Sequence, residues 1–499
     1  MNTLSQRLGE RKVYWITLLS GPLLFLLIAG FFRPADLSKP GVMVLASTVW
    51  VACWWMTEVI PVEVTALVPL ILLPLSGAMP GKQVAGAYAD SIIFLFMGGF
   101  ILALALEKWG LHRRIALGII SKLGSSPGAL IGDFMLATAF LSMWISNTAT
   151  AMMMLPIASA VILRINELFE RSNLAYEKQK FARAIMLGIG YSASIGGLAT
   201  LIGTPPNMIL VGVVKQLYGV EISFGQWMLF GVPLSLVLLV GCWIYLIKVQ
   251  FRGMPKEIAG SDHIFDEEWK KIGRMKWEEK IVLLIFVATS LAWISRTFLL
   301  NRVMPHLDDT IIVMIASVLL FIIPARNGSR LLEWKDAHKL PWGVLLVFGG
   351  GLCIAKGFMT TGLSDWIGKQ LTVLNGVNVI LLVLVVTVLV MVLTEFTSNT
   401  ATATMILPIL ALLAQAVNVH PYLLMVPAAI SASCAFMFPV ATPPNAIVFS
   451  TGHLHISDMV KVGFWLNAFS VLVILALTQL IIGTLWQVDL HSFPQAWIK

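Results

Sequence analysis

Two short polar clusters with the same residues interrupt an otherwise apolar sequence. Ser146–Thr148 lies within SMWISNTATAMMMLP, and Ser398–Thr400 lies within TEFTSNTATATMILP. Hydroxyl and amide oxygens are ligands that hard cations prefer, whereas helix amino termini and amide N–H groups suit carboxylate oxygens. Capping and packing of short helices would explain one such cluster, but it explains two copies poorly. A site built from both clusters could hold an anion beside cations.

A second pair of motifs breaks the apolar pattern later in each half of the chain. GTPPN occupies Gly203–Asn207, and ATPPN occupies Ala441–Asn445. Adjacent prolines remove two backbone donors and disfavour helix at the residue before them. Non-helical backbone at membrane depth persists only where it is buried in protein or lines a water-filled cavity. We therefore expect the clusters and the breaks to share one site.

Charged side chains are almost absent from these motifs. Neither polar cluster and neither proline motif contains Arg or Lys, although Lys356 and other bases at helix ends could approach in the fold. A bound anion would then be balanced by helix termini, amides and co-bound cations, which favours cation-coupled symport over an arginine-clamped exchanger. Glu395 is the exception, and at membrane depth it is either a functional group or a structural acceptor for backbone N–H groups.

The composition indicates which elements must position these residues. The chain has 499 residues, of which 58% are hydrophobic and 12% are charged, whereas soluble domains are about 25% charged. Apolar windows of about 20 residues predict an all-α polytopic membrane protein with about eleven transmembrane helices and two opposed re-entrant hairpins. Basic residues are scattered through loops, which argues against a nucleic-acid partner and predicts a cytoplasmic amino terminus and an outer carboxyl terminus.

The same order of motifs appears twice: a glycine-rich helix, a polar hairpin and a proline-broken helix. The two polar clusters are 252 residues apart, and FLFMGGFILALALEKWGL and LVFGGGLCIAKGFMTTGL have the same separation. This order, with opposite orientations inferred from the charge bias, is typical of inverted-repeat transporters. It predicts a first repeat over residues 1–249 (tip 146–148, break 203–207), a cytoplasmic loop over 250–280, and a second repeat over 281–499 (tip 398–400, break 441–445).

The apolar spans contain no motif for catalysis. They have neither a GxSxG elbow nor an HExxH pair, and the four cysteines form no CxxC motif. We therefore expect a protein that is not an enzyme and that uses no cofactor other than coupling cations.

Together with TEVIPVEVTALVP (Thr57–Pro69), the paired motifs resemble the divalent anion:sodium symporter family, which contains the dicarboxylate and citrate carriers related to the INDY transporters. The resemblance extends from about Val13 to Leu485. It implies a homodimer in which a scaffold domain holds the partners together while a transport domain, containing both hairpins and both broken helices, moves as an elevator.

The resemblance also implies roles for individual residues. The first sodium ion would be bound by Ser142, Ser146, Asn147 and the backbone of Gly203. The second would be bound by Thr394, the backbone of Thr397, Asn399 and the backbone of Ala441. The substrate carboxylates would be bound by Asn147, Thr148, Thr204, Pro205, Asn399, Thr400, Thr442 and Pro443.

The function that these features predict is sodium-coupled symport of C4 dicarboxylates such as succinate, malate and fumarate. The expected location is a bacterial cytoplasmic membrane, with lipid, sodium and the substrate as partners. Two alternatives within the same family stay open, namely a sodium-independent exchanger of dicarboxylates, such as 2-oxoglutarate for malate, and a citrate carrier.

Overall fold

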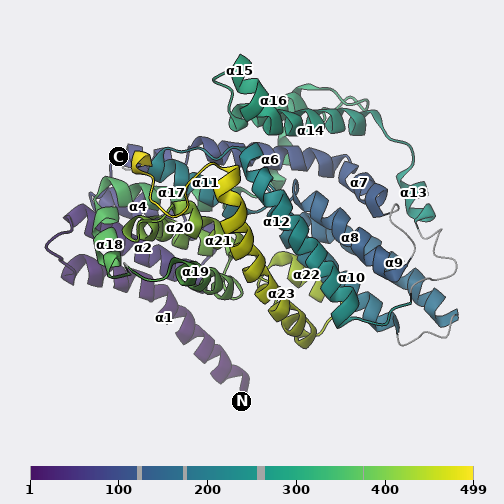
Figure 1. Cartoon of the computed structure of the whole chain (residues 1–499), viewed down its shortest axis with the longest axis horizontal. Helices are drawn as coiled ribbons and strands as arrows, with labels where there is room; N and C mark the ends of the chain where they lie inside the picture. Colours follow the sequence, from purple (N-terminus) through teal and green to yellow (C-terminus); the bar gives the residue numbers. More distant parts are fainter. Residues whose placement is uncertain (1, 121–125, 172–176, 256–264, 375, 498–499) are drawn as a thin grey trace.

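The chain forms an almost entirely helical bundle (Figure 1). The computed structural model describes residues 2–120, 126–171, 177–255, 265–374 and 376–497. Within these ranges the residues form no strand, and the one β-type contact is an isolated bridge between Pro324 and Arg330. The all-α prediction is confirmed. Residues 256–264 of the predicted cytoplasmic loop lie outside the described ranges.

The first seven helices occupy about the first quarter of the chain. They are α1 (Asn2–Phe31), α2 (Lys39–Thr57), α3 (Val62–Thr65), α4 (Val68–Leu75), α5 (Gly81–Ala87), α6 (Ser91–Lys108) and α7 (Leu111–Ile120). The amino-terminal end of α1 extends away from the other helices (Figure 1), and α1 packs on α2, where Trp54 Nε1 donates to Leu18 O at 3.0 Å. Its large apolar side chains are exposed, as expected for a helix surrounded by lipid.

The repeated motifs form two matching sets of helices. The first set is α8 (Pro127–Ser142), α9 (Asn147–Arg171), α10 (Glu177–Gly197), α11 (Pro205–Tyr218) and α12 (Phe224–Ile244). The second set is α19 (Val379–Thr394), α20 (Asn399–Ala416), α21 (Pro421–Ser431), α22 (Pro443–Phe449) and α23 (Ile456–Leu477). Both α8 and α19 have 16 residues. Both α12 and α23 continue into a π-helical turn.

The remaining helices lie between and after these sets. They are α13 (Asp266–Ile272), α14 (Trp277–Ser295), α15 (Asn301–Val303), α16 (Asp309–Ile322), α17 (Trp342–Thr360), α18 (Leu363–Leu371) and α24 (Gly483–Leu485). Figure 1 shows α14, α15 and α16 together along one side of the bundle, next to α6.

Fewer helices than expected are long enough to cross a bilayer. In the described ranges nine helices pass a test of length and apolar composition, or ten if the bent pair α18 and α19 forms one span. The estimate of about eleven from the sequence is higher because three of the expected crossings, Val62–Leu75, Asp309–Ile322 and Pro421–Ser431, are shorter apolar segments. With 14 residues, α16 rises only about 21 Å. The nine include α9 and α20, which we predicted to be limbs of re-entrant hairpins.

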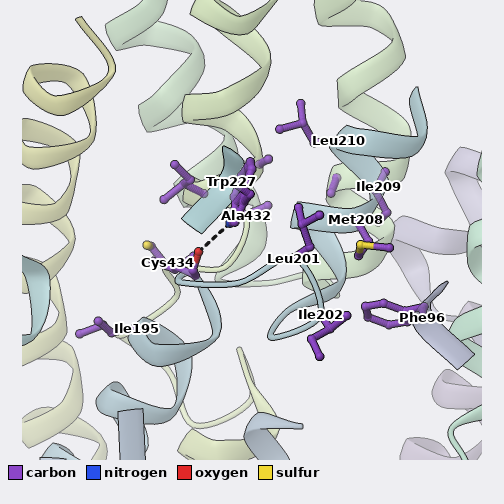
Figure 2. Close-up of a cluster of buried hydrophobic side chains, with 14 of the residues drawn as sticks. Phe96, Ile195, Leu201, Ile202, Met208, Ile209, Leu210, Trp227, Ala432 and Cys434 are labelled. Carbon is purple, nitrogen blue, oxygen red and sulfur yellow. Dashed lines mark hydrogen bonds between the residues drawn. The ribbon is translucent and has the colours of Figure 1, made fainter. Parts of the chain in front are cut away.

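Apolar side chains enclose the two breaks. In the first set α10 packs against α8, α9 and α22, and in the second set α21 packs against α19 and α20. Figure 2 shows Leu201, Ile202 and Met208 around the first break, beside Ala432 and Cys434 of the second break. Because these side chains are buried, the unwound backbone is held within protein, as the rule for non-helical segments at membrane depth requires.

Candidate functional site

The tip of the first hairpin gathers oxygen atoms from four segments. Ser142, the last residue of α8, has its Oγ 2.5 Å from Asn147 Oδ1, at the start of α9, and it donates to Ala193 O at 2.6 Å. The same terminal atom of the Asn147 amide lies 3.1 Å from Ala193 O and 3.2 Å from Gly203 O. With its oxygen toward these groups Asn147 completes a cluster of four oxygens, and with its nitrogen toward them it donates to all three neighbours.

The second hairpin repeats this geometry. Thr394 Oγ1, at the end of α19, lies 2.6 Å from Asn399 Oδ1 and 2.7 Å from Ala432 O, and its one hydrogen can be donated to either oxygen. Threonine thus takes the place of serine, and Ala432 takes the place of Ala193. The hydroxyl of Thr397 is used within the hairpin, where it lies 2.6 Å from Thr402 Oγ1.

An asparagine secures each break. Asn207 Nδ2 donates to Gly197 O at 3.2 Å and to Thr200 O at 2.8 Å. Asn445 Nδ2 donates to Ala435 O at 3.0 Å and to Phe438 O at 3.1 Å. In both halves the acceptors lie ten and seven residues before the asparagine, and both side chains are buried. The repeated asparagine of the proline motifs was the available signal for this role, which the sequence analysis did not assign.

The first break also requires glycine for a close approach of two backbone segments. A Cβ atom on Gly203 would lie 2.5 Å from Gly197 O, and one on Gly197 would lie 2.8 Å from Asn147 Oδ1. Side-chain atoms at either position would therefore push the break away from the hairpin tip.

Different groups hold the two breaks against their hairpins. In the first half Thr200 Oγ1 donates to Met143 O at 2.5 Å and accepts from Gly203 N at 3.1 Å. In the second half the carboxylate of Glu395, which is only 2% exposed, accepts from several donors. They are Phe436 N at 2.9 Å, Met437 N at 3.1 Å, Phe438 N at 3.3 Å and Asn467 Nδ2 at 2.6 Å. Glu395 thus has the role of a structural acceptor.

The tips and the breaks surround one cavity of about 720 Å³. All eight residues predicted to bind carboxylates line it, namely Asn147, Thr148, Thr204, Pro205, Asn399, Thr400, Thr442 and Pro443. Four residues predicted at the sodium sites also line it: Ser146, Gly203, Thr397 and Ala441. Ser142 and Thr394 lie behind the two asparagines, where they contact the amides but not the cavity.

The tips and the breaks contribute polar but no charged side chains to the cavity. Helices α9 and α20 begin at its wall, where helix N–H groups carry partial positive charge. Helix α11 also begins there, but its first two residues are prolines, which have no N–H group. Ser146 Oγ accepts from Ala149 N at 3.2 Å, so one hydroxyl of the first cluster does cap its helix. The charged residues that line the cavity are Glu58, Glu107 and Lys339, all of them exposed, whereas Lys356 does not reach the lining.

The sequence matches known transporters along nearly its whole length. The family described as the sodium:sulfate symporter transmembrane region matches residues 12–490. The sodium-dependent dicarboxylate transporter SdcS of Staphylococcus saprophyticus is 50% identical over 479 residues, which cover 95% of this chain and 92% of the relative. SdcS of Staphylococcus aureus strain USA300 is 50% identical over 482 residues, covering 96% and 93%.

Two solved structures share the fold at low sequence identity. The Neisseria gonorrhoeae MtrF structure, whose title describes a class of antimetabolite efflux pumps, has a TM-score of 0.56 at 12% identity and covers 92% of this chain and 96% of its own. The Alcanivorax borkumensis YdaH transporter has a TM-score of 0.54 at 10% identity and covers 90% and 99%. The family match and the 50% identical relatives confirm the resemblance found in the motifs. The chain therefore belongs to the sodium:sulfate symporter family of divalent anion:sodium symporters, which are integral membrane transporters and not enzymes.

Proposed function

We propose that the protein carries out sodium-coupled symport of C4 dicarboxylates such as succinate, malate and fumarate. The observation that carries the proposal is the cavity in which two asparagine-centred tips face two proline breaks, with no basic side chain among the described residues of its deep part. The relatives named sodium-dependent dicarboxylate transporter support the same substrate and the same coupling ion.

The proposed sodium ions bind beside the two amides. The first is held by Ser142, Ser146, Asn147 and the backbone of Gly203, and the second by Thr394, Asn399 and the backbones of Thr397 and Ala441. The fit rests on the donor atoms: at the first tip a hydroxyl and two main-chain carbonyls lie 2.5–3.2 Å from one terminal atom of the Asn147 amide. With the amide oxygen at that position, the four neutral oxygens suit a hard monovalent cation. At the second tip Ala432 O contributes the corresponding carbonyl.

The substrate carboxylates are proposed to bind between the tips. Each tip and the facing break offer an amide, threonine hydroxyls and helix N–H groups, so two such sets suit an anion with two carboxylates. The set comprises Asn147, Thr148, Thr204, Pro205, Asn399, Thr400, Thr442 and Pro443. The tips and breaks contain no Arg or Lys that could balance the charge of the substrate. Sodium ions bound at the tips would neutralise it instead, so anion binding would depend on sodium.

For the whole protein we propose a homodimer in a bacterial cytoplasmic membrane, with the amino terminus in the cytoplasm and the carboxyl terminus outside. The repeats 1–249 and 281–499 would enter the membrane in opposite orientations, so that the hairpins approach the site from opposite faces. The hairpins and broken helices would form the transport domain that moves as an elevator against a scaffold containing α2, α6, α14, α16 and α17.

Uptake of labelled succinate into proteoliposomes tests the proposed coupling. We expect uptake with an inward sodium gradient and little uptake when potassium or choline replaces sodium on both sides. Equal uptake with and without sodium would rule out the coupling. Uptake that needs a dicarboxylate in the lumen would instead identify an exchanger, and a panel with malate, fumarate, 2-oxoglutarate and citrate would identify the preferred substrate.

A further inference from the structure

The mouth of the cavity has a charged rim made of Glu58, Glu107 and Lys339. Glu58 follows the last residue of α2, Glu107 lies in the last turn of α6, and Lys339 ends a 3₁₀ helix over Trp334–Lys339. All three residues are exposed, whereas the polar lining around Thr204 and Thr442 is buried. An anion that moves between water and the tips through this mouth must pass these three charges.

Two contacts hold this rim together. Lys108 Nζ lies 2.7 Å from Asp336 Oδ2, so the end of α6 is tied to the 3₁₀ helix. Trp109 Nε1 donates to Leu331 O at 2.9 Å, which adds a second tie between the same two segments. Lys339 is therefore carried by a segment that is tied to the end of α6.

The charge of Lys339 is not neutralised by a neighbouring acid among the described residues. On the same segment Lys335 lies 2.5 Å from Glu333 Oε2, and Lys108 pairs with Asp336. Lys339 makes no such ion pair in the described ranges, where it is also the one Lys or Arg that lines the cavity. A flexible ammonium group with free donors at a cavity mouth suits a carboxylate.

We propose that Lys339 is a substrate-binding residue that holds one carboxylate of the dicarboxylate at the mouth before the substrate reaches the tips, and that it thereby sets the substrate affinity from this face. The inference rests on the proposed function. The rim has a net charge of −1 with Lys339 and −2 without it, so loss of Lys339 removes the one attractive group and strengthens the repulsion of an entering dianion. In the proposed elevator the rim belongs to the scaffold, and Lys339 therefore meets the substrate only when the cavity faces its own side.

Kinetics of the Lys339→Gln variant in proteoliposomes tests the proposal, with Lys335→Gln as the matched control. Lys335 is exposed on the same 3₁₀ helix but does not line the cavity. The rim face is the side of the membrane on which Lys339 lies. When succinate is added on this side at saturating sodium, we expect Lys339→Gln to raise the KM for succinate about tenfold and to change the maximal rate less than about twofold. Lys339→Arg should restore the wild-type KM, and Lys335→Gln should leave it unchanged.

Sidedness and ionic strength provide two further readouts. Transport measured from the opposite face should show the wild-type KM in Lys339→Gln. Added salt should raise the wild-type KM more than that of the variant, because an exposed charge is screened over about 10 Å at 0.1 M salt. Equal salt dependence in both proteins would overturn the proposal.

The Glu107→Gln variant gives an independent test that does not depend on the folding of Lys339→Gln. Removal of one rim acid should lower the succinate KM about twofold to threefold, and an unchanged or raised KM would overturn the proposal. A wild-type KM in Lys339→Gln, or the same shift in Lys335→Gln, would also overturn it while leaving the proposed symport intact. A wild-type protein without sodium-dependent uptake would overturn both.

Discussion

Asn147 contacts three other segments directly, and Asn399 contacts the end of α19 and reaches Ala432 through Thr394, which distinguishes both residues from ordinary helix caps. Each amide contacts the hydroxyl of the residue that ends the preceding helix, Ser142 or Thr394. That hydroxyl in turn donates to a main-chain carbonyl of the neighbouring helix or break. The amides and hydroxyls therefore link each hairpin tip to the neighbouring helix or break. We expect a ligand that binds at the tip to change the position of that segment as well.

Replacement of either asparagine should remove transport and preserve the fold. In Asn147→Ala the Ser142 hydroxyl keeps its bond to Ala193 O, so the hairpin stays closed while one oxygen donor of the site is lost. We expect sodium-dependent succinate uptake to fall at least about 100-fold in Asn147→Ala and in Asn399→Ala, with an unchanged elution volume in size-exclusion chromatography.

Asn327→Ala is the matched control for these two variants. Asn327 lies in an exposed turn, where its side chain accepts from Ser329 N at 3.1 Å. Its removal should leave uptake at the wild-type rate. Normal uptake in Asn147→Ala or Asn399→Ala would remove that asparagine from the proposed site.

For individual residues, the sequence identifies the side chains of the site better than it identifies the backbone groups that take part. The repeated Ser-Asn-Thr and Thr-Pro-Pro motifs identify residues that the fold brings to one cavity. The carbonyls of Ala193 and Ala432 could not be found in this way, because an alanine in a helical pattern gives no sign that its carbonyl oxygen accepts a hydroxyl. Lys339 was also missed, since its approach to the cavity depends on tertiary contacts of a loop segment.

Among the elements, the two broken helices differ most in how they are fixed. Met143 occupies the position in the first half that Glu395 occupies in the second, 252 residues later. Met143 offers only its carbonyl, to the hydroxyl of Thr200, whereas Glu395 offers a carboxylate to three consecutive backbone N–H groups. From the sequence alone, Glu395 could be a functional group or a structural acceptor, and these contacts favour the structural role.

Removal of the Glu395 carboxylate should loosen the second break and leave the first unchanged. Glu395→Ala leaves several buried donors without an acceptor, which costs on the order of 3 kcal/mol or more. Hydrogen–deuterium exchange should therefore accelerate at Phe436–Phe438 and stay at the wild-type rate around Gly203. Glu395→Gln keeps one oxygen acceptor and should show a smaller change. Unchanged exchange at Phe436–Phe438 in Glu395→Ala would contradict the structural role.

The helix α7 is fixed to its neighbours by ion pairs. Arg113 lies 2.8 Å from Glu268 Oε2 of α13, and Arg114 lies 2.6 Å from Glu279 Oε2 of α14. The side chains of the second pair are 15% and 6% exposed. Because α7 follows α6 directly, these pairs fix the direction in which the chain leaves α6.

Arg114→Ala should destabilise the protein more than a comparable change at the surface. It leaves Glu279 largely buried without its partner, which we expect to cost about 1–3 kcal/mol. Arg164→Ala is the control, because Arg164 and Glu167 form a pair at 54% and 56% exposure that contributes less than about 0.5 kcal/mol. Thermal unfolding in detergent measures both, and equal midpoints for the two variants would contradict the expected difference.

For the whole molecule, apolar windows and repeated motifs predicted the helical class and the matching helix sets, but not the lengths of all helices. The equal lengths of α8 and α19 agree with the repeat. The break between α3 and α4 was not predicted, because apolar composition alone does not reveal where a buried helix ends.

The proposed elevator motion can be tested with a disulfide between α6 and the first break. A Cβ atom on Gly99 would lie 3.5 Å from Ile202 Cβ, which is within the range of disulfides. Oxidation of the Gly99→Cys/Ile202→Cys double variant should lock the cavity on one face and abolish uptake, and a reductant should restore it.

Both single variants serve as controls and should transport under oxidising conditions. Full uptake by the oxidised, cross-linked double variant would exclude relative motion of α6 and the break during transport.

Native mass spectrometry tests the proposed homodimer. The wild-type protein should have twice the mass of the 54.7 kDa chain, and a mass of one chain would contradict the dimer.

The hydrogen bond between Asn467 and Glu395 affects the order in which the two halves can fold during synthesis. The groups that fix the first break, from Ser142 to Asn207, are all present once the ribosome has passed Asn207. The second break instead needs Asn467, which belongs to the last long helix. Because domains form progressively from the amino terminus during synthesis, the first half can mature early, whereas the second waits for the insertion of α23. A nascent chain that stops before α23 would therefore expose an unfinished break to the quality-control machinery of the membrane.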